Sequence, residues 1–401
     1  MGLNDTPSAN RIHIGFFGRR NAGKSSVVNA VTGQDLAVVS DHKGTTTDPV
    51  TKAIELLPLG PVVIMDTPGY DDDEATLGRL RVNRTKRTLN RTDIAVLVVD
   101  AVEGMNDGDR EMLRTFRSKE QPSLVVYNKA DLIPVSDRRE ENGLYVSART
   151  GEGIYELKER LGALAPKEST RRIIRDLLKP DDLVVLVTPI DEAAPKGRMI
   201  LPQVQTIRDV LDGNAMCVVT KETQLAGLLA SLGRKPAMVV TDSQVFKTVA
   251  DITPKEIPLT SFSMLMARFK GFLDTAVDGV AALQDLKEGD SILIAEGCTH
   301  HRQCNDIGTV KIPNWIRQYT GNKVRIDTCS GAEFPEDVSK YKVVLSCGGC
   351  MLSEREMLYR MKCSLDQGVP FTNYGVVIAY IQGILPRALS LFPELLKKLD
   401  Q

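Results

Sequence analysis

A glycine-rich segment near the start of the chain has the composition and spacing of a phosphate-binding loop. The segment runs from Gly18 to Ser25 and reads Gly-Arg-Arg-Asn-Ala-Gly-Lys-Ser. In such a loop the glycines let backbone N–H groups surround phosphate oxygens, the lysine reaches the β and γ phosphates, and the last hydroxyl binds Mg²⁺. We therefore expect Lys24 to act on the phosphates of a nucleotide and Ser25 to be a magnesium ligand.

Three further motifs follow in the order that a guanine-nucleotide site requires. Asp66-Thr67-Pro68-Gly69 follows an apolar run, and its aspartate can hold magnesium through the water shell of the ion. In Asn128-Lys129-Ala130-Asp131 the aspartate can accept hydrogens from N1 and N2 of guanine, which adenine does not offer. Ser147-Ala148 comes after the next apolar run and can support the base. These motifs predict GTP, rather than ATP, as the nucleotide.

A second group of reactive residues lies near the end of the chain. Six of the seven cysteines follow residue 297, and an odd number of cysteines argues against a disulfide framework. Cys298-Thr299-His300-His301 and Ser346-Cys347-Gly348-Gly349-Cys350 combine thiols with imidazoles. Thiolates separated by two glycines can turn toward one metal, and three cysteines suit zinc or an iron–sulfur cluster. A redox dithiol and unreactive buried cysteines are the alternatives.

The other cysteines carry weaker signals. Cys329 follows an apolar run and could face the same crevice, although a packing role is more typical. Cys217 lies in an apolar run and Cys363 in a helical pattern, so we expect both in the core. Cys304 lies close to Cys298 in the chain.

Val- and Ile-rich runs alternate with helical patterns throughout, which is typical of parallel α/β layers. The strands predicted are Ile12–Phe17, Val62–Met65, Ile94–Val99, Leu124–Tyr127, Leu144–Val146, Leu183–Val187, Ala215–Val219, Met238–Val240, Ile257–Leu259, Ser291–Ala295, Lys323–Asp327 and Lys342–Leu345. Helices are predicted over Glu168–Lys179, Glu354–Leu365 and Ala388–Leu399, and a loop is predicted over Asp191–Gln203. Cysteine-bearing segments follow the last three strands, where loops of a parallel sheet gather.

Composition narrows the class of protein. With 401 residues, two or three domains are expected, and Pro166 and Pro180 favour a first boundary between them. The boundaries predicted are 1–166, 167–264 and 265–401. The 51 Lys and Arg residues nearly balance the 52 Asp and Glu residues, which disfavours nucleic acid or an anionic membrane as a partner. Neither a signal peptide nor a long apolar span is recognised, so we expect a cytoplasmic protein.

The segment from about Arg11 to Leu164 resembles the TrmE–Era type of GTPase. This resemblance implies a switch threonine within Gly44-Thr45-Thr46-Thr47, with Thr46 as the expected magnesium ligand and Thr45 and Thr47 as alternatives. It also implies a potassium site at Asn21, for which a turn-capping role is the alternative. Tyr70 stands where Ras-type enzymes have a water-orienting glutamine, so slow hydrolysis is expected. The residues expected to contact nucleotide, with Lys24, Thr46 and Gly69 as the catalytic ones, are Gly18, Asn21, Ala22, Gly23, Lys24, Ser25, Ser26, Thr46, Asp66, Gly69, Asn128, Lys129, Asp131, Ser147 and Ala148.

The combination of such a GTPase with the cysteine motifs resembles the FeFe-hydrogenase maturation GTPases, the HydF family. Cys298, His300, Cys347 and Cys350 match the cluster motif of that family, whereas Ser346 replaces an expected histidine. The resemblance implies a P-loop GTPase domain followed by two smaller parallel α/β domains, for dimerisation and for cluster binding. It implies a 4Fe–4S cluster on the three cysteines, with His300, His301, Asp306 or an exogenous ligand at the fourth position.

By the same resemblance, the chain is a homodimeric scaffold or carrier. It would accept a di-iron precursor from two radical-SAM maturases and deliver it to apo FeFe-hydrogenase, with GTP controlling partner association. Two alternative functions are a ribosome- or RNA-associated GTPase with a structural zinc site and a GTP-regulated thiol-redox enzyme. The neutral charge and the lack of a basic stripe disfavour the first alternative.

Overall fold

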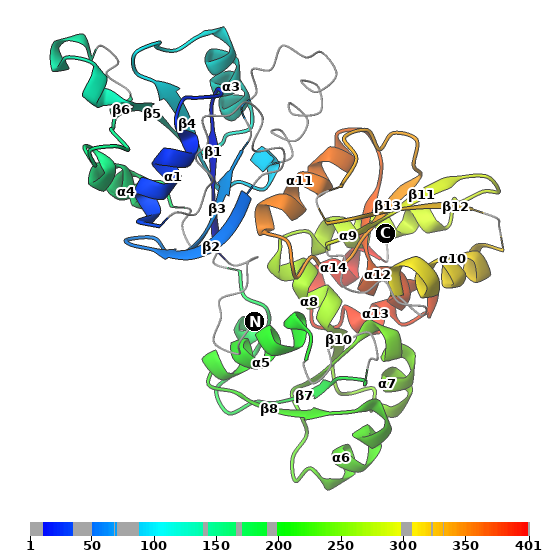
Figure 1. Cartoon of the computed structure of the whole chain (residues 1–401). Coiled ribbons are helices and arrows are strands. Elements are labelled where there is room, and N and C mark those ends of the chain that lie inside the picture. The colour runs from blue at the N-terminus through cyan, green and yellow to red at the C-terminus, as the bar shows by residue number, and fades with distance from the viewer. Residues whose placement is uncertain are drawn as a thin grey trace. The chain divides into compact units, whose positions relative to one another are not determined.

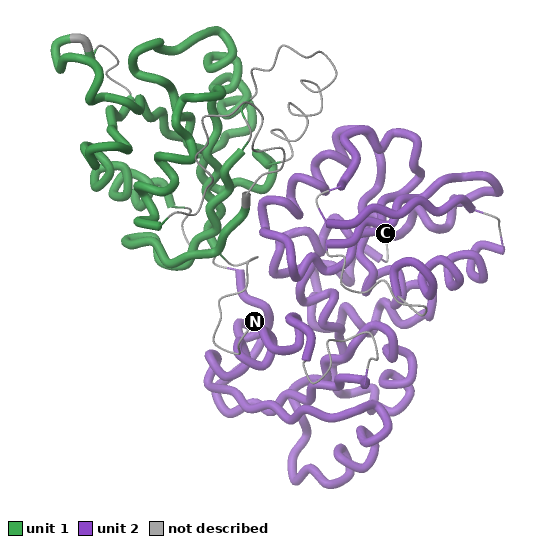
Figure 2. Tube along the Cα trace, viewed as in Figure 1, with its two compact units in different colours: residues 1–168 green, residues 169–401 purple. Residues whose placement is uncertain are grey.

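The computed structural model describes residues 11–34, 50–67, 69, 88–138, 143–165, 171–190, 199–297, 307–321, 324–331 and 333–399. The chain divides into two compact units, residues 1–168 and 169–401 (Figure 1, Figure 2). Each unit has its own hydrophobic core, and each is described by itself.

Unit 1 is a six-stranded sheet with helices on both faces. The strand order is β2-β3-β1-β4-β5-β6, and only the pairing of β2 with β3 is antiparallel. The strands are β1 (Ile12–Phe17), β2 (Val50–Leu56), β3 (Gly60–Asp66), β4 (Ile94–Asp100), β5 (Ser123–Asn128) and β6 (Leu144–Tyr145). The helices are α1 (Lys24–Thr32), α3 (Asp107–Ser118) and α4 (Ile154–Ala163), with short 3₁₀ turns at Ala130–Leu132 and Val135–Asp137.

The central strands of unit 1 are apolar on both faces, because helices cover both. Alternate residues of β4 belong to two different cores: Ile94 and Val96 pack with α1 and α4, whereas Leu97 packs with Phe116 of α3. This period of two is what a strand between two helical layers requires. The carboxyl ends of β1, β3, β4 and β5 consequently lie at one edge of the sheet.

Unit 2 contains two four-stranded sheets, and all of their strand pairs are parallel. The first has the order β10-β9-β7-β8 and consists of β7 (Leu183–Val187), β8 (Met216–Thr220), β9 (Met238–Thr241) and β10 (Leu259–Ser261). The second has the order β12-β11-β13-β14 and consists of β11 (Ser291–Glu296), β12 (Arg325–Ser330), β13 (Val343–Ser346) and β14 (Phe371–Asn373).

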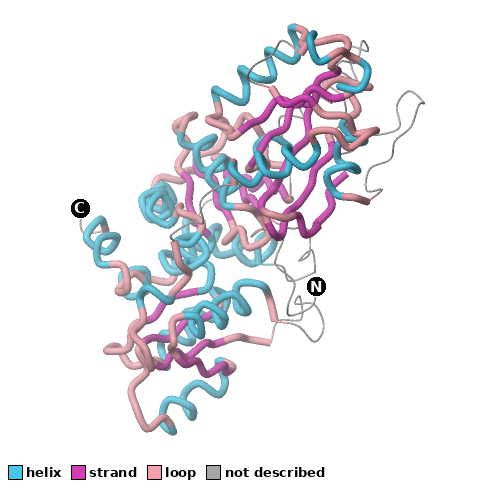
Figure 3. Tube along the Cα trace, turned by 90° about the vertical axis from the view of Figure 1, so that its left-hand side faces the viewer, coloured by secondary structure: helices cyan, strands magenta, loops and turns pink. Residues whose placement is uncertain are grey.

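Helices separate and flank these two sheets (Figure 3). Those after β7, β8 and β9 are α5 (Leu201–Asp212), α6 (Leu225–Ser231) and α7 (Phe246–Ile252). The remaining helices are α8 (Phe262–Phe269), α9 (Leu273–Gly279), α10 (Ile312–Thr320), α11 (Glu354–Leu365), α12 (Tyr374–Ile381), α13 (Leu385–Ala388) and α14 (Pro393–Lys398), with 3₁₀ turns at Arg175–Leu177, Glu222–Gln224, Ser243–Val245 and Val280–Leu283 and a π-helical turn at Ile307–Lys311. A single hydrophobic core runs from Ile173 to Phe392 through both sheets.

The α/β fold class predicted from the sequence is confirmed, but several elements differ. The helix predicted over Glu168–Lys179 is wrong for its described part, which contains only a 3₁₀ turn at Arg175–Leu177. The Asp209 carboxylate of α5 accepts the N–H groups of Ile174 and Arg175 at 2.7 and 2.9 Å, which holds this segment against the unit. Those two N–H groups are therefore unavailable for helical bonds.

Other differences concern unpredicted strands, the end of a loop and a divided helix. The sequence patterns did not predict β2 and β14. The predicted loop over Asp191–Gln203 ends earlier, because α5 already begins at Leu201; residues 191–198 lie outside the described residues. The single C-terminal helix predicted over Ala388–Leu399 is two short helices, α13 and α14, separated by a turn before Pro393. Among the described residues, every helix is too short or too polar to cross a membrane.

Candidate functional site

The phosphate loop joins β1 to α1 and folds around the ammonium group of Lys24. Lys24 is 8% exposed, and its Nζ donates to the carbonyl oxygens of Gly18 at 3.0 Å and Arg19 at 2.7 Å. The loop needs left-handed backbone, with φ of 60° at Asn21 and 83° at Gly23. Asparagine tolerates this region better than most residues do. The loop geometry therefore accounts for Asn21 even without a bound cation.

Two oxygen ligands suited to magnesium lie side by side at the ends of α1 and β3. The Ser25 hydroxyl donates to Asp66 Oδ2 at 2.6 Å. Burial raises the pKa of the Asp66 carboxyl, and the Ser25 hydrogen bond and the Lys24 charge partly offset that rise. A divalent cation would favour the charged form of this carboxylate, and its oxygen chemistry suits Mg²⁺.

Gly69 lies against the phosphate loop. A Cβ at this position would be 2.7 Å from the backbone nitrogen of Arg20, so a side chain would push the two segments apart. Thr67, two residues earlier, donates its hydroxyl and its N–H to the carbonyl of Phe16 at 2.7 and 3.2 Å. The segment after β3 is thus attached to β1 immediately before the phosphate loop.

Asn128 joins the base-binding loops to the phosphate loop. Its Nδ2 donates to the carbonyl of Ala22 at 3.1 Å, and its Oδ1 accepts the N–H of Ala148 at 3.1 Å. Asp131 accepts the Ser147 hydroxyl at 2.7 Å, which orients the carboxylate predicted to read guanine. The structure therefore brings together the three predicted segments that carry Ala22, Asn128 to Asp131, and Ser147 to Ala148.

The ion pairs made by Lys129 and by Arg19 were not predicted from the sequence. The Lys129 ammonium lies 2.5 Å from Asp100 Oδ2. Burial tends to raise the pKa of Asp100, but hydrogen bonds from Lys129 and from the N–H of Val102 outweigh it and lower the pKa. Asp100 ends β4, and residues at the carboxyl ends of parallel strands line the ligand-binding edge of a sheet. This position could have indicated Asp100 as a site residue from the sequence.

Arg19 makes the second unpredicted contact. Its guanidinium lies 2.9 Å from Glu103 and 3.2 Å from the fully buried Asp109, and it donates to the carbonyl of Gly104 at 2.8 Å. Asp109 also caps α3 together with Asn106. These contacts join the phosphate loop to the start of α3, and the wide sequence separation left no local pattern for them.

The cysteine site lies at the carboxyl edge of the second sheet of unit 2. Cys347 immediately follows β13, and its Sγ accepts the N–H groups of Gly297 at 3.0 Å and Gly349 at 3.4 Å. Burial raises the pKa of the Cys347 thiol, while these two N–H groups and the charge of Arg360 partly lower it. Peptide N–H groups directed at a sulfur are a usual environment for a metal-bound thiolate. The donor set around Cys347 therefore fits an iron–sulfur ligand.

The two glycines after Cys347 shape the turn toward Cys350. Gly349 has φ of 65°, and a Cβ there would lie 2.4 Å from Met357 Sδ. A left-handed glycine at this point lets the chain reverse tightly before α11. Cys350 is half-buried, as Cys347 is, and both pack against the core of the unit.

Cys329 lies near the same edge, on β12 beside Ala295 of β11. Burial raises the pKa of its thiol to about 11, the positive charge of Arg360 acts to lower it, and Cys347 contributes a further rise. Cys217 was predicted to lie in the core but is half-buried on the edge strand β8. Cys363 is half-buried on α11, against the carbonyl of Glu336 at 3.4 Å.

Several predicted site residues lie outside the described residues. They are Thr46 with its neighbours Thr45 and Thr47, Tyr70, Cys298, His300, His301, Cys304 and Asp306. Within the described ranges, no three His, Cys, Asp or Glu side chains converge as a metal site would require. The described residues supply two of the three predicted cysteine ligands, Cys347 and Cys350.

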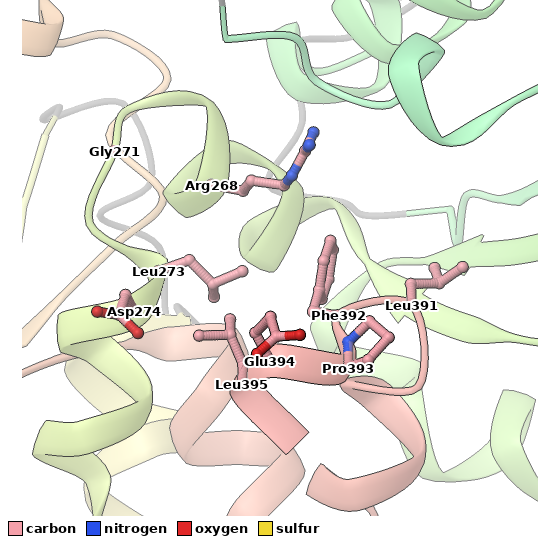
Figure 4. A pocket seen from close by; sticks show the side chains of 9 residues that line it. All are labelled: Arg268, Gly271, Leu273, Asp274, Leu391, Phe392, Pro393, Glu394 and Leu395. Atoms are coloured by element: carbon pink, nitrogen blue, oxygen red, sulfur yellow. The ribbon is translucent and has the colours of Figure 1, made fainter. Parts of the chain in front are cut away.

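A cavity of about 420 Å³ opens elsewhere in unit 2 (Figure 4). Apolar side chains such as Leu273, Phe392 and Leu395 line it, together with Arg268 and Asp274. The Arg268 guanidinium is already bound to Asp176 and to the carbonyl of Arg172, and Asp274 pairs with Lys398 at 2.5 Å. The cavity contains none of the predicted site residues.

Comparison with protein families matches three successive parts of the chain. A 50S ribosome-binding GTPase model matches residues 13–129. The model described as the hydrogen maturase F dimerization domain matches residues 173–271, and that of the hydrogen maturase F tetramerization domain matches residues 274–391. The latter two together cover more than half of the chain.

Similar individual proteins match only the nucleotide-binding part. The tRNA modification GTPase MnmE of Bordetella petrii is 34% identical over 154 residues, which are 38% of this chain and 34% of that protein. MnmE of a Synechococcus species is 37% identical over 157 residues, with the same coverage. The chain thus spans about a third of the length of these relatives. Era from Aquifex aeolicus, solved with GDP and AlF₄⁻, is 19% identical with a TM-score of 0.36, over 55% of this chain and 98% of Era.

Proposed function

The chain belongs to the hydrogen maturase F family, whose domain models follow its GTPase domain, and from this premise we propose that it is an iron–sulfur scaffold. The chain is a hydrogenase-maturation GTPase. As a scaffold it would accept a di-iron precursor of the hydrogenase active site and pass it to the apo-hydrogenase. The observation that carries this proposal is the Cys347 sulfur, which lies at a strand end and accepts two peptide N–H groups.

A 4Fe–4S cluster fits the donors at this edge. Cys347 and Cys350 come from the loop after β13, and Cys298 follows β11 by two residues. The cluster would supply an iron that is not bound by cysteine and can bind the precursor. Its fourth ligand would be His300, His301, Asp306 or an exogenous group, because Ser346 takes the place of a histidine. A ligand that binds iron more weakly than thiolate can be displaced, which suits a scaffold that must hand over its cargo.

Hydrolysis of GTP requires the residues of unit 1. Lys24 would neutralise charge on the β and γ phosphates, Ser25 and Thr46 would bind Mg²⁺, and Gly69 would contact the γ phosphate through its backbone. Asn21 would bind K⁺ beside the phosphates. With Tyr70 in place of a water-orienting amide, hydrolysis would be slow, which suits a switch that controls association with partners.

The proposed dimer uses the edge strand β8. In the parallel pair β7–β8, Met216 donates its N–H to the Asp182 carbonyl at 2.8 Å, and the Thr220 carbonyl accepts from Thr188 at 2.8 Å. Alternate residues of a strand bond in opposite directions, so Cys217 and Val219 direct their N–H groups to the free edge. Met216 and Val219 are 43% and 42% exposed there, which favours pairing with β8 of a second copy.

Iron and sulfide content after anaerobic reconstitution tests the scaffold proposal. Four iron and four sulfide ions per chain, with an iron–sulfur absorption band, are expected. Cys298→Ala, Cys347→Ala and Cys350→Ala should each lose most of the cluster, while Cys217→Ala and Cys363→Ala retain it. His300→Ala should alter the electronic spectrum more than the iron content. One zinc ion without sulfide would instead support a structural zinc site, and a reversible dithiol without metal would support a redox enzyme.

Nucleotide specificity and cation dependence test the GTPase half separately. Wild-type protein should hydrolyse GTP far faster than ATP and faster in K⁺ than in Na⁺. Lys24→Ala should abolish hydrolysis and leave the iron content unchanged, since the two sets of residues belong to different units. Loss of iron in a folded Lys24→Ala protein would show that the two sites depend on each other.

A further inference from the structure

The largest completely buried side chain among the described residues is a charged one, Arg360 of α11. Removing a guanidinium from water costs several kcal/mol unless its partners satisfy it, so the groups that satisfy Arg360 show what it holds in place. Arg360 belongs to neither of the motifs that the sequence singled out. Its position next to the cysteine edge therefore requires an explanation.

Arg360 contacts three different segments. Its Nε donates to Glu356 Oε1 on the same helix at 2.9 Å, and Glu356 is only 4% exposed. Its Nη1 donates to the carbonyl of Glu296 at 3.3 Å, and its Nη2 donates to the carbonyl of Gly331. The ring of Phe334 lies 5.3 Å from the guanidinium carbon. The planar fork of arginine suits such simultaneous contacts, which a lysine could not reproduce.

These contacts connect Arg360 to the chain segments next to the cysteines. Glu296 ends β11 and precedes Cys298 by two residues, and Gly331 follows Cys329 by two residues. The helix that bears Arg360 begins directly after the loop of Cys347 and Cys350. One guanidinium thus connects the ends of β11 and β12 to the helix that follows β13.

We infer that Arg360 is a positioning residue for the metal centre: it fixes the backbone at these strand ends and places a positive charge beside the thiolates. This inference rests on the proposed metal-binding function of the cysteines. Three thiolates around a metal centre leave local negative charge, and the buried carboxylates of Glu296 and Glu356 add to it. The guanidinium offsets part of this negative charge at a buried position, where water cannot screen it.

Zinc binding by the metal-free protein tests the inference independently of any cluster. Groups of this kind alter metal affinity by about 10- to 100-fold. In Arg360→Met, which keeps the volume but removes charge and donors, the affinity for Zn²⁺ should fall by at least ~10-fold. Arg360→Lys should fall between wild type and Arg360→Met, since it restores charge without the fork. Both are compared by competition with a chromogenic zinc chelator under anaerobic conditions.

Arg387→Met is the matched control. Arg387 also donates to backbone carbonyls in unit 2, those of Ala250 at 2.5 Å and Thr253 at 2.6 Å, and these lie in and after α7, away in sequence from the cysteine segments. Arg387→Met should therefore bind zinc as wild type does. Equal zinc affinity in folded Arg360→Met and wild type would overturn the inference. An equal loss in Arg387→Met would also overturn it, because the effect would then be general destabilisation.

The reduction potential of the reconstituted cluster distinguishes an effect of the Arg360 charge from an effect of its packing. Arg360→Met should shift it to more negative values, because a nearby cation favours the reduced, more negative state. Glu356→Gln should shift it in the opposite direction, because it removes a carboxylate and leaves the guanidinium. Glu356→Gln also provides the test if Arg360→Met does not fold, and an unchanged or negative shift would then contradict the inference. A wild-type protein without iron or sulfide would refute the scaffold proposal, and the zinc comparison would still decide the role of Arg360.

Discussion

Asp131 is the residue through which we propose that the nucleotide site selects guanine. Its carboxylate accepts the hydroxyl of Ser147 at 2.7 Å, so its orientation is fixed before any base is bound. Guanine offers two hydrogens, at N1 and N2, to such an acceptor, and adenine offers neither. An oriented carboxylate loses little conformational freedom when the base binds, which favours affinity as well as specificity.

We expect Asp131→Asn to exchange guanine for xanthine specificity. The amide N–H can donate to the carbonyl at C2 of xanthine. Facing guanine, the same N–H meets the N2 amino group, which is also a donor, so no hydrogen bond forms there. Hydrogen bonds to a charged group contribute about 1.5–3 kcal/mol each, so GTP affinity should fall by ~100-fold or more. Competition between labelled GTP and xanthosine triphosphate measures the change. Ser147→Ala, which only releases the carboxylate, should weaken GTP binding without a gain for xanthosine triphosphate; unchanged GTP affinity in Asp131→Asn would remove Asp131 from the site.

Residues of contiguous motifs were predictable, and those that act across the fold were not. The roles proposed for Lys24, Ser25 and Asp131 follow from spacing alone, because the chemistry of a phosphate loop or a base-reading loop is local. The pairing of Lys129 with Asp100 joins two strand ends, and that of Arg19 with Asp109 joins the phosphate loop to α3. Arg360 was missed because nothing in a helical pattern marks a charged residue that the fold will bury.

At the scale of elements, β8 is the least protected strand of the first sheet in unit 2. Each of its residues is exposed or half-buried, whereas every residue of the central strand β7 is buried. β10, at the opposite edge, is completely buried, with α13 nearby. Proteins usually blunt an open edge with charge, but β8 reads Met-Cys-Val-Val-Thr. This contrast supports β8 as the dimerisation edge.

We expect Val219→Lys to convert the proposed dimer to a monomer. In the paired strands, the two introduced lysines, one from each copy, would bring charges of the same sign close together. The apolar contact made by Val219 would also be lost. Analytical ultracentrifugation over a range of protein concentrations measures the result. Leu365→Lys, at a residue that is similarly exposed (45%) on α11, is the matched control and should leave the dimer intact. A Val219→Lys protein that remains dimeric would place the interface elsewhere.

Strands that are apolar over several residues were predicted well, as β1 and β7 show, because burial on both faces leaves a continuous signal. The short strand β14 has only three residues, too few for any periodicity. The segment near Arg175 has a helical pattern, but Asp209 binds its N–H groups, and a tertiary contact of that kind cannot be seen in a local window.

At the scale of the whole chain, separate cores predict separate unfolding. In the part of the chain that the structure describes, the cores of unit 1 share no residue with the core that runs through unit 2. We expect two thermal transitions in calorimetry, and Mg²⁺ with GDP should raise only one of them. A ligand at 100 times its Kd stabilises the state that binds it by about 2.7 kcal/mol. Lys24→Ala should abolish that rise, and a single transition that shifts as a whole would contradict independent units.

The continuous core of unit 2 also has an evolutionary consequence. Two family models divide this unit near residue 272, yet Phe262 and Phe371, from either side of that division, belong to the same core. A recombination event at this point would expose apolar surface on both products, so neither half would be inherited alone as a stable protein. The smallest heritable piece that carries the cysteines is then the whole of residues 169–401. A lineage could exchange its GTPase domain for another by recombination. The sheet that carries the cysteines, however, would have to be transferred together with the first sheet of unit 2.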